Sequence, residues 1–217
     1  MCYNSFMKFI YPEKIPVFPL SGVIYFPKTN LPLNIFEPKY LDLVTDTMNG
    51  NKFMGMVQSR KDKNDLYNIG CLGKISDLKK SEDGRLIINL TGISRFEIKK
   101  EIKNKKEYRE FEISYEMFEN DTDQKDNNSL DSEQLTYFIT NTKKFFEKNG
   151  LILNWNEFKK LSQDQQVNTL AMIAPVTNEE KQKLLETVTI KNKTQILLDI
   201  IKFYMYENNL DNLKTVN

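Results

Sequence analysis

The spacing of apolar residues changes near residue 120. From Phe111 to Met117 every second residue is apolar, and most earlier apolar segments are short runs. Beyond residue 131, apolar residues recur three or four positions apart, as they do from Leu135 to Phe146. A period of two is typical of strands, and a period of 3.6 is typical of helices. The pattern therefore predicts strands followed by helices, which is an α+β fold.

Strands are predicted over most of the first half of the chain. They cover about residues 15–20, 31–36, 52–59, 67–79, 85–99 and 108–117, and a helix is expected over about 38–49. Asp83-Gly84 predicts a tight hairpin turn, because glycine adopts positive φ without strain. Gly92 is expected to interrupt its strand, and Gly55 suggests a bulge or a close approach of other atoms. A second turn is predicted in the basic run 103–106.

Helices are predicted in the second half. They cover about residues 131–148, 162–175, 177–186 and 191–207, with a short helical turn at 154–160. Ser162 with Gln165, and Thr177 with Glu180, have the spacing of capping boxes. In a capping box the two side chains satisfy backbone N–H groups at the start of a helix. These pairs therefore mark where two of the helices begin.

Residues 119–131 separate the two halves and carry almost no apolar side chain. The chain is accordingly divided into a β-rich domain at 1–118, a solvated linker at 119–131 and a helical domain at 132–217. Asp121, Asp123 and Asp126 raise the alternative of a calcium loop. An EF-hand that began at Asp121 would need glycine at 126 and glutamate at 132, but the chain has aspartate and serine there. We therefore expect a linker and no metal.

Five prolines punctuate the stretch from Ile15 to Tyr40. Proline removes a hydrogen-bond donor, so within sheets it is confined to edges, strand starts and turns. The stretch therefore predicts two short strands joined by a turn-rich loop. Pro38 suits the first position of the following helix, where its missing N–H costs nothing.

The same stretch resembles the start of the Lon protease N-terminal, substrate-binding domain, in the form found in short stand-alone proteins. The matching segments are Ile15-Pro16-Val17-Phe18-Pro19-Leu20, Leu31-Pro32-Leu33 and Ile35-Phe36-Glu37-Pro38-Lys39-Tyr40. The family usually has arginine where Lys39 stands. Later segments are also similar, namely Gly70 to Ile75, Asp83-Gly84, Gly92-Ile93-Ser94-Arg95 and Val167 to Leu185. The resemblance covers roughly residues 14–206.

This resemblance implies a PUA-like β pseudobarrel followed by a helical bundle. It also implies a non-enzymatic module that binds unfolded or partly folded polypeptides, with a separate protease or chaperone as an expected partner. In full-length Lon, ATP hydrolysis and proteolysis belong to other domains. The chain contains no G-x-x-x-x-G-K-[ST] motif, and the nearest run, Gly70 to Ile75, has the wrong spacing. Neither ATPase nor protease activity is expected, and no cofactor is expected.

The composition excludes several kinds of chemistry. The chain has no histidine, so it cannot form a Ser-His-Asp or Cys-His catalytic system or a histidine-ligated metal site. Its two cysteines, Cys2 and Cys71, are too few for a structural zinc site and suggest a reducing compartment. No segment has the pattern of a signal peptide or a membrane span. We therefore expect a cytoplasmic location and no membrane partner.

Charged residues offer two further hypotheses. With 31 basic and 30 acidic residues, the net charge of +1 does not demand a nucleic acid partner. The basic run 99–106 could still bind RNA phosphates through a PUA-like barrel, and this remains the alternative function. Glu110, Glu112 and Glu116 share one face of a predicted strand and could act in acid–base chemistry. Alternation places them on the outward face, so a solvated strand face is favoured and no catalytic residue is expected.

An apolar surface is the remaining candidate site. The loop from Val23 to Phe26 carries more apolar residues than a surface loop normally does. Exposed apolar patches mark contacts with peptides or proteins. The candidate peptide-binding residues are Tyr25, Phe26, Leu33, Phe36 and Tyr40. The alternative is that these side chains simply close one end of the barrel.

Overall fold

The computed structural model describes residues 11–60, 65–122 and 129–214, with side chains up to Tyr206. The strands are β1 (Lys14–Leu20), β2 (Asn30–Ile35), β3 (Phe53–Ser59), β4 (Leu66–Lys80), β5 (Leu86–Ile102) and β6 (Arg109–Ser114). The helices are α1 (Pro38–Asn49), the 3₁₀ helix η1 (Glu116–Asp121), α2 (Ser132–Lys148), α3 (Trp155–Phe158), α4 (Gln163–Ile173), α5 (Asn178–Glu186) and α6 (Ile190–Lys214). The α+β fold predicted from the sequence is confirmed.

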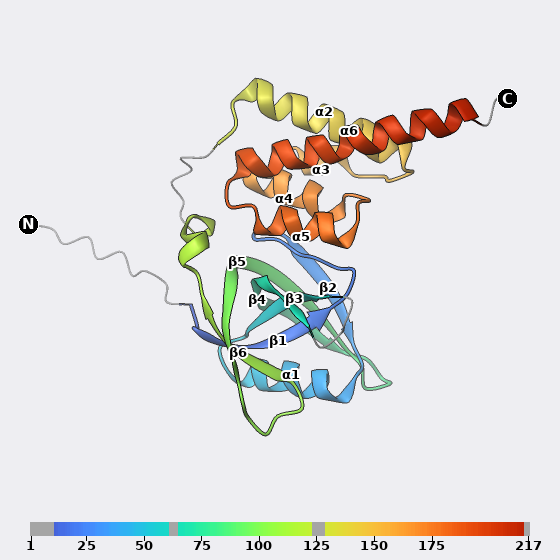
Figure 1. The fold of residues 1–217 in the computed structure, drawn as a ribbon. Coiled ribbons are helices and arrows are strands. Elements are labelled where there is room, and N and C mark those ends of the chain that lie inside the picture. Colours follow the sequence, from blue (N-terminus) through green and yellow to red (C-terminus); the bar gives the residue numbers. More distant parts are fainter. Residues whose placement is uncertain (1–10, 61–64, 123–128, 215–217) are drawn as a thin grey trace, which may run out of the picture.

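The strands form one mixed sheet that closes on itself. Their order is β2-β5-β4-β3-β1-β6, and β5 also pairs with β6, which closes the ring β5-β4-β3-β1-β6 and leaves β2 attached to it through β5. β1 and β3 are parallel, and the other pairs are antiparallel. Helix α1 covers one end of this pseudobarrel, and α2 to α6 gather at the other end (Figure 1). The sheet is therefore enclosed between one helix and a helical bundle.

Glycines allow the strands to approach closely. A Cβ atom at Gly55 would lie 2.6 Å from Cδ1 of Ile15, which confirms the close approach expected there. Gly92 does not end its strand, because β5 runs through it. The pairing with β4 instead shifts by one residue, from Leu72 opposite Ser94 to Gly73 opposite Gly92. The expected interruption is therefore a bulge within a continuous strand.

Apolar side chains from the barrel take part in the core of the helical bundle. Two buried clusters fill the barrel and the space beneath α1. A third cluster holds the buried residues of the helices, and Ile24, Phe26, Ile69 and Phe118 contribute to it from the barrel side. The two halves therefore share a hydrophobic core. The proposed division at 119–131 stays a prediction.

The segment after β6 differs from the sequence prediction. The strand ends at Ser114, three residues earlier than expected, and η1 follows it. The helix turns Phe118 into the core, whereas Met117 is exposed instead of sharing the inward face of the strand. Asp121 forms a buried ion pair, so this residue does not lie in a solvated linker. Asp123 and Asp126 lie outside the described residues.

The helical predictions are confirmed. Helices α2, α4 and α5 lie where the apolar period placed them, and both predicted capping boxes are formed. Helix α6 begins where expected but continues to Lys214, beyond the expected end near residue 207. A third capping box, Asp131 with Gln134, opens α2. In that box the Gln134 N–H donates to Asp131 at 2.7 Å. Local side-chain hydrogen bonds thus fix the starts of three helices in the bundle.

Candidate functional site

The structure separates the five candidate residues into two groups. Tyr25 and Phe26 are only 2% and 0% exposed, so the prediction that they form an exposed apolar surface is wrong. Tyr25 packs in the barrel core and Phe26 packs in the core of the helical bundle. The loop between β1 and β2 runs along the boundary between the barrel and the helices (Figure 1). Ile24, Tyr25 and Phe26 are buried there, whereas Val23 is 37% exposed.

Two glycines make room for this loop. A Cβ atom at Gly73 would lie 1.9 Å from the hydroxyl oxygen of Tyr25, and one at Gly92 would lie 2.1 Å from the carbonyl oxygen of Phe26. The Gly92 N–H donates to the Thr29 carbonyl oxygen, and the Gly92 carbonyl accepts from the Lys28 N–H, both at 2.9 Å. The loop is therefore bonded to β5 at Gly92, where the absence of a side chain lets the two backbones approach.

Leu33, Phe36 and Tyr40 form the second group, and they lie at the surface around the end of β2. Phe36 is 64% exposed, whereas Leu33 and Tyr40 are half-buried against the barrel core. The Tyr40 ring lies 4.3 Å from the Phe18 ring, and Nζ of Lys39 lies 4.7 Å from the Tyr40 ring centroid. We call Leu33, Phe36 and Tyr40 the β2 surface. Its most accessible apolar group is Phe36.

A group of uncharged polar side chains lies on the outer face of the sheet beside β2. Asn30, Ser76, Asn89 and Thr91 are joined by hydrogen bonds across β2, β5 and β4. Thr91 Oγ1 donates to Asn30 Oδ1 at 2.8 Å and lies 3.1 Å from Ser76 Oγ. Asn89 Nδ2 donates to Ser76 Oγ at 3.0 Å. These cross-strand bonds hold β2 in register with the rest of the sheet.

Arg95 is the most heavily bonded side chain at the boundary between the two halves. It is 3% exposed and forms a bidentate pair with Asp121, at 2.8 Å from Nε and 2.6 Å from Nη2. Its Nη1 and Nη2 atoms also donate to the carbonyl oxygens of Leu185, Thr187 and Val188. The guanidinium thus joins β5 to η1 and to the end of α5, and all of its charge is compensated by acceptors.

Lys193 is a second buried cation at the same boundary. Nζ of Lys193 donates to Asn168 Oδ1 at 2.7 Å and lies 4.8 Å from the centroid of the Phe26 ring. Asn168 in turn donates to the Pro27 carbonyl oxygen at 3.0 Å. Burial, together with the positive charge of Arg95, lowers the pKa of Lys193 to about 7. Helices α4 and α6 therefore hold the loop between β1 and β2 through polar contacts as well as apolar ones.

Arg95 and Lys193 were not among the predicted site residues, although the sequence contained a signal for each of them. Arg95 closes the Gly-x-x-Arg segment quoted above, but nothing in that segment indicates its partner. Lys193 lies four residues before Leu197 on the buried face of α6. A charged residue at such a position is almost never buried without a partner. That position could have indicated a buried polar contact.

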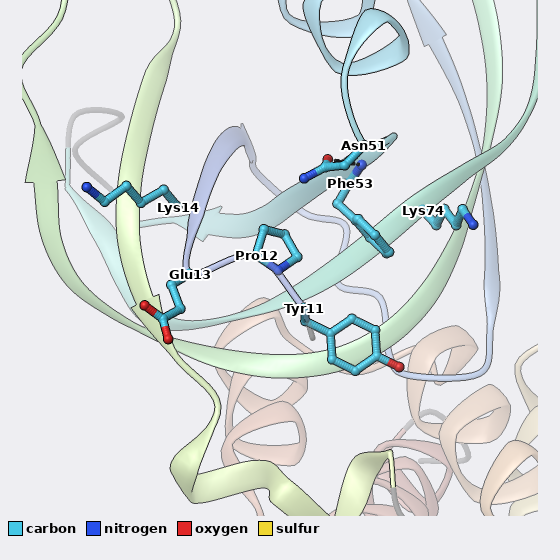
Figure 2. Close-up of a pocket in the computed structure, with 7 residues that line it drawn as sticks. All are labelled: Tyr11, Pro12, Glu13, Lys14, Asn51, Phe53 and Lys74. Atoms are coloured by element: carbon cyan, nitrogen blue, oxygen red, sulfur yellow. Dashed lines mark hydrogen bonds between the residues drawn. The ribbon is translucent and has the colours of Figure 1, made fainter. Parts of the chain in front are cut away.

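An open cavity of about 650 Å³ lies where the segment before β1 meets the start of β3. Figure 2 shows the Tyr11 and Phe53 rings near its centre, with Glu13 and Lys14 on one side and Lys74 on the other. The two rings meet edge to face at 6.0 Å, and Nζ of Lys74 lies 5.7 Å from the Phe53 ring centroid. None of the candidate residues of the β2 surface lines this cavity, and its described lining offers no nucleophile beside a base.

The charged candidates lie in ordinary surface contacts. The basic run forms the hairpin between β5 and β6, where Nζ of Lys99 pairs with Glu97 at 2.6 Å and Nζ of Lys106 with Glu110 at 3.0 Å. Lys14 pairs with Glu112 at 3.5 Å. The described side chains include no group of three potential metal ligands. Glu110 and Glu112 thus neutralise neighbouring lysines on the outer face of β6.

Cys71 is buried in β4, and burial raises the pKa of its thiol. A buried, protonated thiol is a poor nucleophile. Cys2 lies outside the described residues.

Among the helices that the structure describes, none combines the length and apolar character needed to cross a membrane.

Curated relatives of this chain are Lon proteases. The chain is 29% identical to the Lon protease of Desulfosudis oleivorans over 191 residues, which make up 83% of this chain and 22% of that protein. It is 27% identical to the Lon protease of Buchnera aphidicola subsp. Schizaphis graminum over 201 residues, which make up 87% of this chain and 25% of that protein. The chain spans about a quarter of the length of these curated relatives.

Solved structures with the same fold are Lon N-terminal domains. A Lon N-terminal domain protein from Xanthomonas campestris superposes with a TM-score of 0.62 at 19% identity, over 86% of this chain and 97% of that one. The N-terminal domain of a Mycobacterium avium complex Lon protease gives a TM-score of 0.64 at 15% identity, over 87% of this chain and 98% of that one. At these identities the likeness shows the fold alone.

The family of the chain follows from its sequence. The sequence model of the ATP-dependent protease La (LON) substrate-binding domain matches residues 14–202, which span the barrel and most of the helical bundle. The chain therefore belongs to the LON substrate-binding domain family.

Proposed function

We propose that this chain binds unfolded or partly folded polypeptides at the β2 surface. The description of its family as substrate-binding supports the choice of ligand, because the relatives are proteases that act on polypeptides. The observation that carries the site is the exposure of Phe36, 64% of whose surface is open to solvent directly after the last residue of β2. Aromatic side chains are frequent anchors of protein and peptide contacts.

Binding without catalysis is the second part of the proposal. The matched family model is that of the substrate-binding part of Lon. Burial of Cys71 and the absence of histidine from the sequence argue against a Cys-His or Ser-His catalytic system. Of the three carboxylates considered for acid–base chemistry, Glu110 and Glu112 lie on β6 beside lysines, whereas Glu116 lies in η1 and does not share their strand face. A module of this kind would deliver polypeptides to a protease or chaperone, which is the adaptor role inferred from the family.

Weak binding is expected from such a surface. Burying one phenylalanine side chain contributes about 1.5–3 kcal/mol, which corresponds to a change in affinity of roughly ten- to a hundred-fold. A single accessible ring with two half-buried neighbours therefore favours rapid, reversible contacts with many polypeptides. The loss of Phe36 should remove most of this affinity.

The test measures the affinity of the purified protein for a fluorescent, disulfide-free model polypeptide that stays unfolded in buffer. Phe36→Ser is expected to weaken binding by at least about ten-fold, because it removes the anchor. The matched control is Phe203→Ser, which removes a ring of similar exposure (56%) from α6. Circular dichroism checks that both variants stay folded. Unchanged binding by Phe36→Ser, or an equal loss in Phe203→Ser, would contradict the site.

RNA binding is the competing function, and a parallel sample with structured RNA tests it. Two lysines of the basic run already pair with carboxylates, so the hairpin offers fewer positive charges than its sequence suggests. Phosphate contacts lose affinity steeply as salt rises. Salt-sensitive RNA binding without any polypeptide binding would replace the proposed function.

A further inference from the structure

Strand β2 has a free edge. Within the described part of the chain its only strand partner is β5, which leaves the other side of β2 unpaired. The residues that alternate along it, Asn30, Pro32 and Asn34, are all exposed. Such an edge presents backbone N–H and C=O groups that another extended chain can bond.

The register of β2 shows which backbone groups point outward. The Gly92 N–H donates to the Thr29 carbonyl oxygen, so Thr29 faces β5. In an antiparallel pair, successive residues alternate between facing the partner strand and facing away. Leu31, Leu33 and Ile35 therefore bond with β5, whereas the backbone groups of Asn30, Pro32 and Asn34 face the free side. Pro32 has no N–H, and its place on the free side costs the sheet no bond.

We infer that polypeptides bind this chain by adding a strand to the free edge of β2, with an apolar side chain placed against Phe36. The inference rests on the proposed function and specifies how the β2 surface binds. The unpaired backbone of Asn30 and Asn34 supplies donors and acceptors, and Pro32 supplies an acceptor. In strand addition, hydrogen bonds to the backbone of the ligand provide affinity, and contacts with its side chains provide selectivity.

The edge selects for extended, uncharged segments. No ionisable side chain lies between Asn30 and Phe36. The charged residues that flank this segment are paired, Lys28 with Asp164 and Lys39 with Glu37 at 3.6 Å, so their charges offset one another. A ligand gains nothing from its own charge here, whereas it must have free backbone groups. Folded proteins offer few of these outside their edge strands, because most of their backbone groups are already bonded. The favoured ligand class is therefore an unfolded segment with apolar side chains.

Hydrogen exchange of the backbone amides gives a direct test in the full chain. Without ligand, the amides of Asn30 and Asn34 should exchange fast, and those of Leu31, Leu33 and Ile35 should exchange slowly. A saturating unfolded apolar peptide should slow exchange at Asn34, because its N–H becomes bonded. Unchanged exchange at Asn34 under conditions where the peptide is bound would overturn strand addition.

Backbone-modified ligands and a donor-deleting variant provide a second test. A fluorescent apolar peptide is compared with a twin that carries methyl groups on its central backbone nitrogens. Loss of the backbone bonds should weaken binding by about ten-fold or more. Asn34→Pro should have a similar effect, because it removes an outward donor without removing a bond to β5. The control is Asn34→Ala, which keeps the N–H and should bind like the unmodified protein.

The outcomes separate the binding mode from the function. If the methylated twin and Asn34→Pro bind normally while Phe36→Ser does not, strand addition is wrong and the β2 surface binds through side chains alone. If Asn34→Ala is as weak as Asn34→Pro, the Asn34 amide side chain makes the contact and the inference also fails. If no unfolded peptide binds the protein at all, the proposed function and the strand addition fall together. The methylated peptide needs no variant, so the test stands even if Asn34→Pro does not fold.

Discussion

Among single residues, Arg95 joins three segments that are distant in the sequence. Its side chain bonds to Asp121 in η1 and to carbonyl oxygens at the end of α5, while its backbone belongs to β5. The carbonyls at the end of a helix carry partial negative charge and lack intrahelical partners. The guanidinium satisfies these carbonyls and the carboxylate at once. Removing either partner therefore leaves buried polar groups without a hydrogen-bond partner.

We expect Arg95→Met to lower the free energy of unfolding by about 3–5 kcal/mol, because it leaves the Asp121 carboxylate buried without its cation. Asp121→Asn should cost less, because the carbonyl acceptors of Arg95 remain. Urea unfolding at pH 7 measures both. The control is Glu101→Gln, which breaks the exposed pair between Glu101 and Arg109 and should cost less than about 1 kcal/mol. Equal losses in Asp121→Asn and Glu101→Gln would show that burial adds nothing to the pair.

The exposure expected of the candidate peptide-binding residues is found at Phe36 but not at Tyr25 or Phe26. The binding site itself stays a prediction. Tyr25 and Phe26 could not be assigned correctly, because their burial depends on Gly73 and Gly92, which lie in other strands and have no side chain at the contact. The pattern of residues along one segment cannot indicate a contact with glycines in other strands.

Among the elements, α6 contributes an unusual buried lysine to its contact with the barrel. The groups that affect Lys193 come from several elements, namely Arg95 of β5, Asp121 of η1, Cys71 of β4 and Asp164 of α4. Its pKa of about 7 lies far below the usual value for lysine, chiefly because burial disfavours the charged form. In the unfolded chain the same amine titrates near its ordinary pKa of about 10.4.

This difference predicts how stability changes with pH. Between pH 7 and 10 the unfolded chain binds more protons at Lys193 than the folded chain does, so the free energy of unfolding should rise with pH. The slope due to one such group approaches 1.4 kcal/mol per pH unit at most, by an order-of-magnitude argument. Urea unfolding at pH 7.0 and 8.5 measures it. Lys193→Met should remove this rise, and Lys191→Met, at an exposed position of the same helix, should keep it.

Comparing Lys193→Met with the unmodified protein also cancels the contribution of Cys71 to the pH dependence of stability, because both proteins contain Cys71. Burial raises the pKa of that thiol, so its contribution to stability is lost as pH rises above its unfolded value of about 8.5. This effect has the opposite sign but is present in every variant with Cys71. A rise with pH that persists unchanged in Lys193→Met would show that another group causes it.

Most elements could be predicted from the sequence because their determinants are local. Alternation, prolines and capping boxes lie within the segments that they shape, and these segments match the observed strands and helices. The end of β6 could not be predicted, because Tyr115 and Met117 continue the alternation past Ser114. The strand ends there because η1 turns Phe118 into a core supplied by the helices. Packing between distant segments overrides the local pattern at this point.

For the whole molecule, the shared core predicts that the barrel and the helices unfold together. Phe26, Phe118 and Ile69 would be exposed if the helices detached, and Arg95 and Lys193 would lose their partners. The single tryptophan, Trp155, reports on the helical half by its fluorescence. The buried thiol of Cys71 reports on the barrel by its reactivity, once Cys2 is replaced by serine. Both signals should change at the same urea concentration.

Two separated midpoints would contradict this expectation. They would support the division at 119–131 into independently stable domains, which the sequence composition suggested. The turns predicted at Asp83-Gly84 and at 103–106 indicated that β5 pairs with β4 and β6. The closing topology was beyond the sequence, because no local pattern indicates that β2 pairs with β5 or that β1 pairs with β3 and β6. Long-range pairings of this kind are set by the three-dimensional arrangement of several segments at once.

The hydrogen bonds of Arg95 also constrain the order in which Arg95 and Asp121 can be substituted during evolution. A surface ion pair can exchange its two residues and keep its attraction. Here an aspartate at position 95 would face the carbonyl oxygens of Leu185, Thr187 and Val188, which are acceptors and cannot bond a carboxylate. Exchanging the two residues therefore does not preserve the contacts. A variant that loses Arg95 first contains a buried Asp121 without its cation. Replacement of Asp121 must come first, so the path of substitution through this pair runs in one direction.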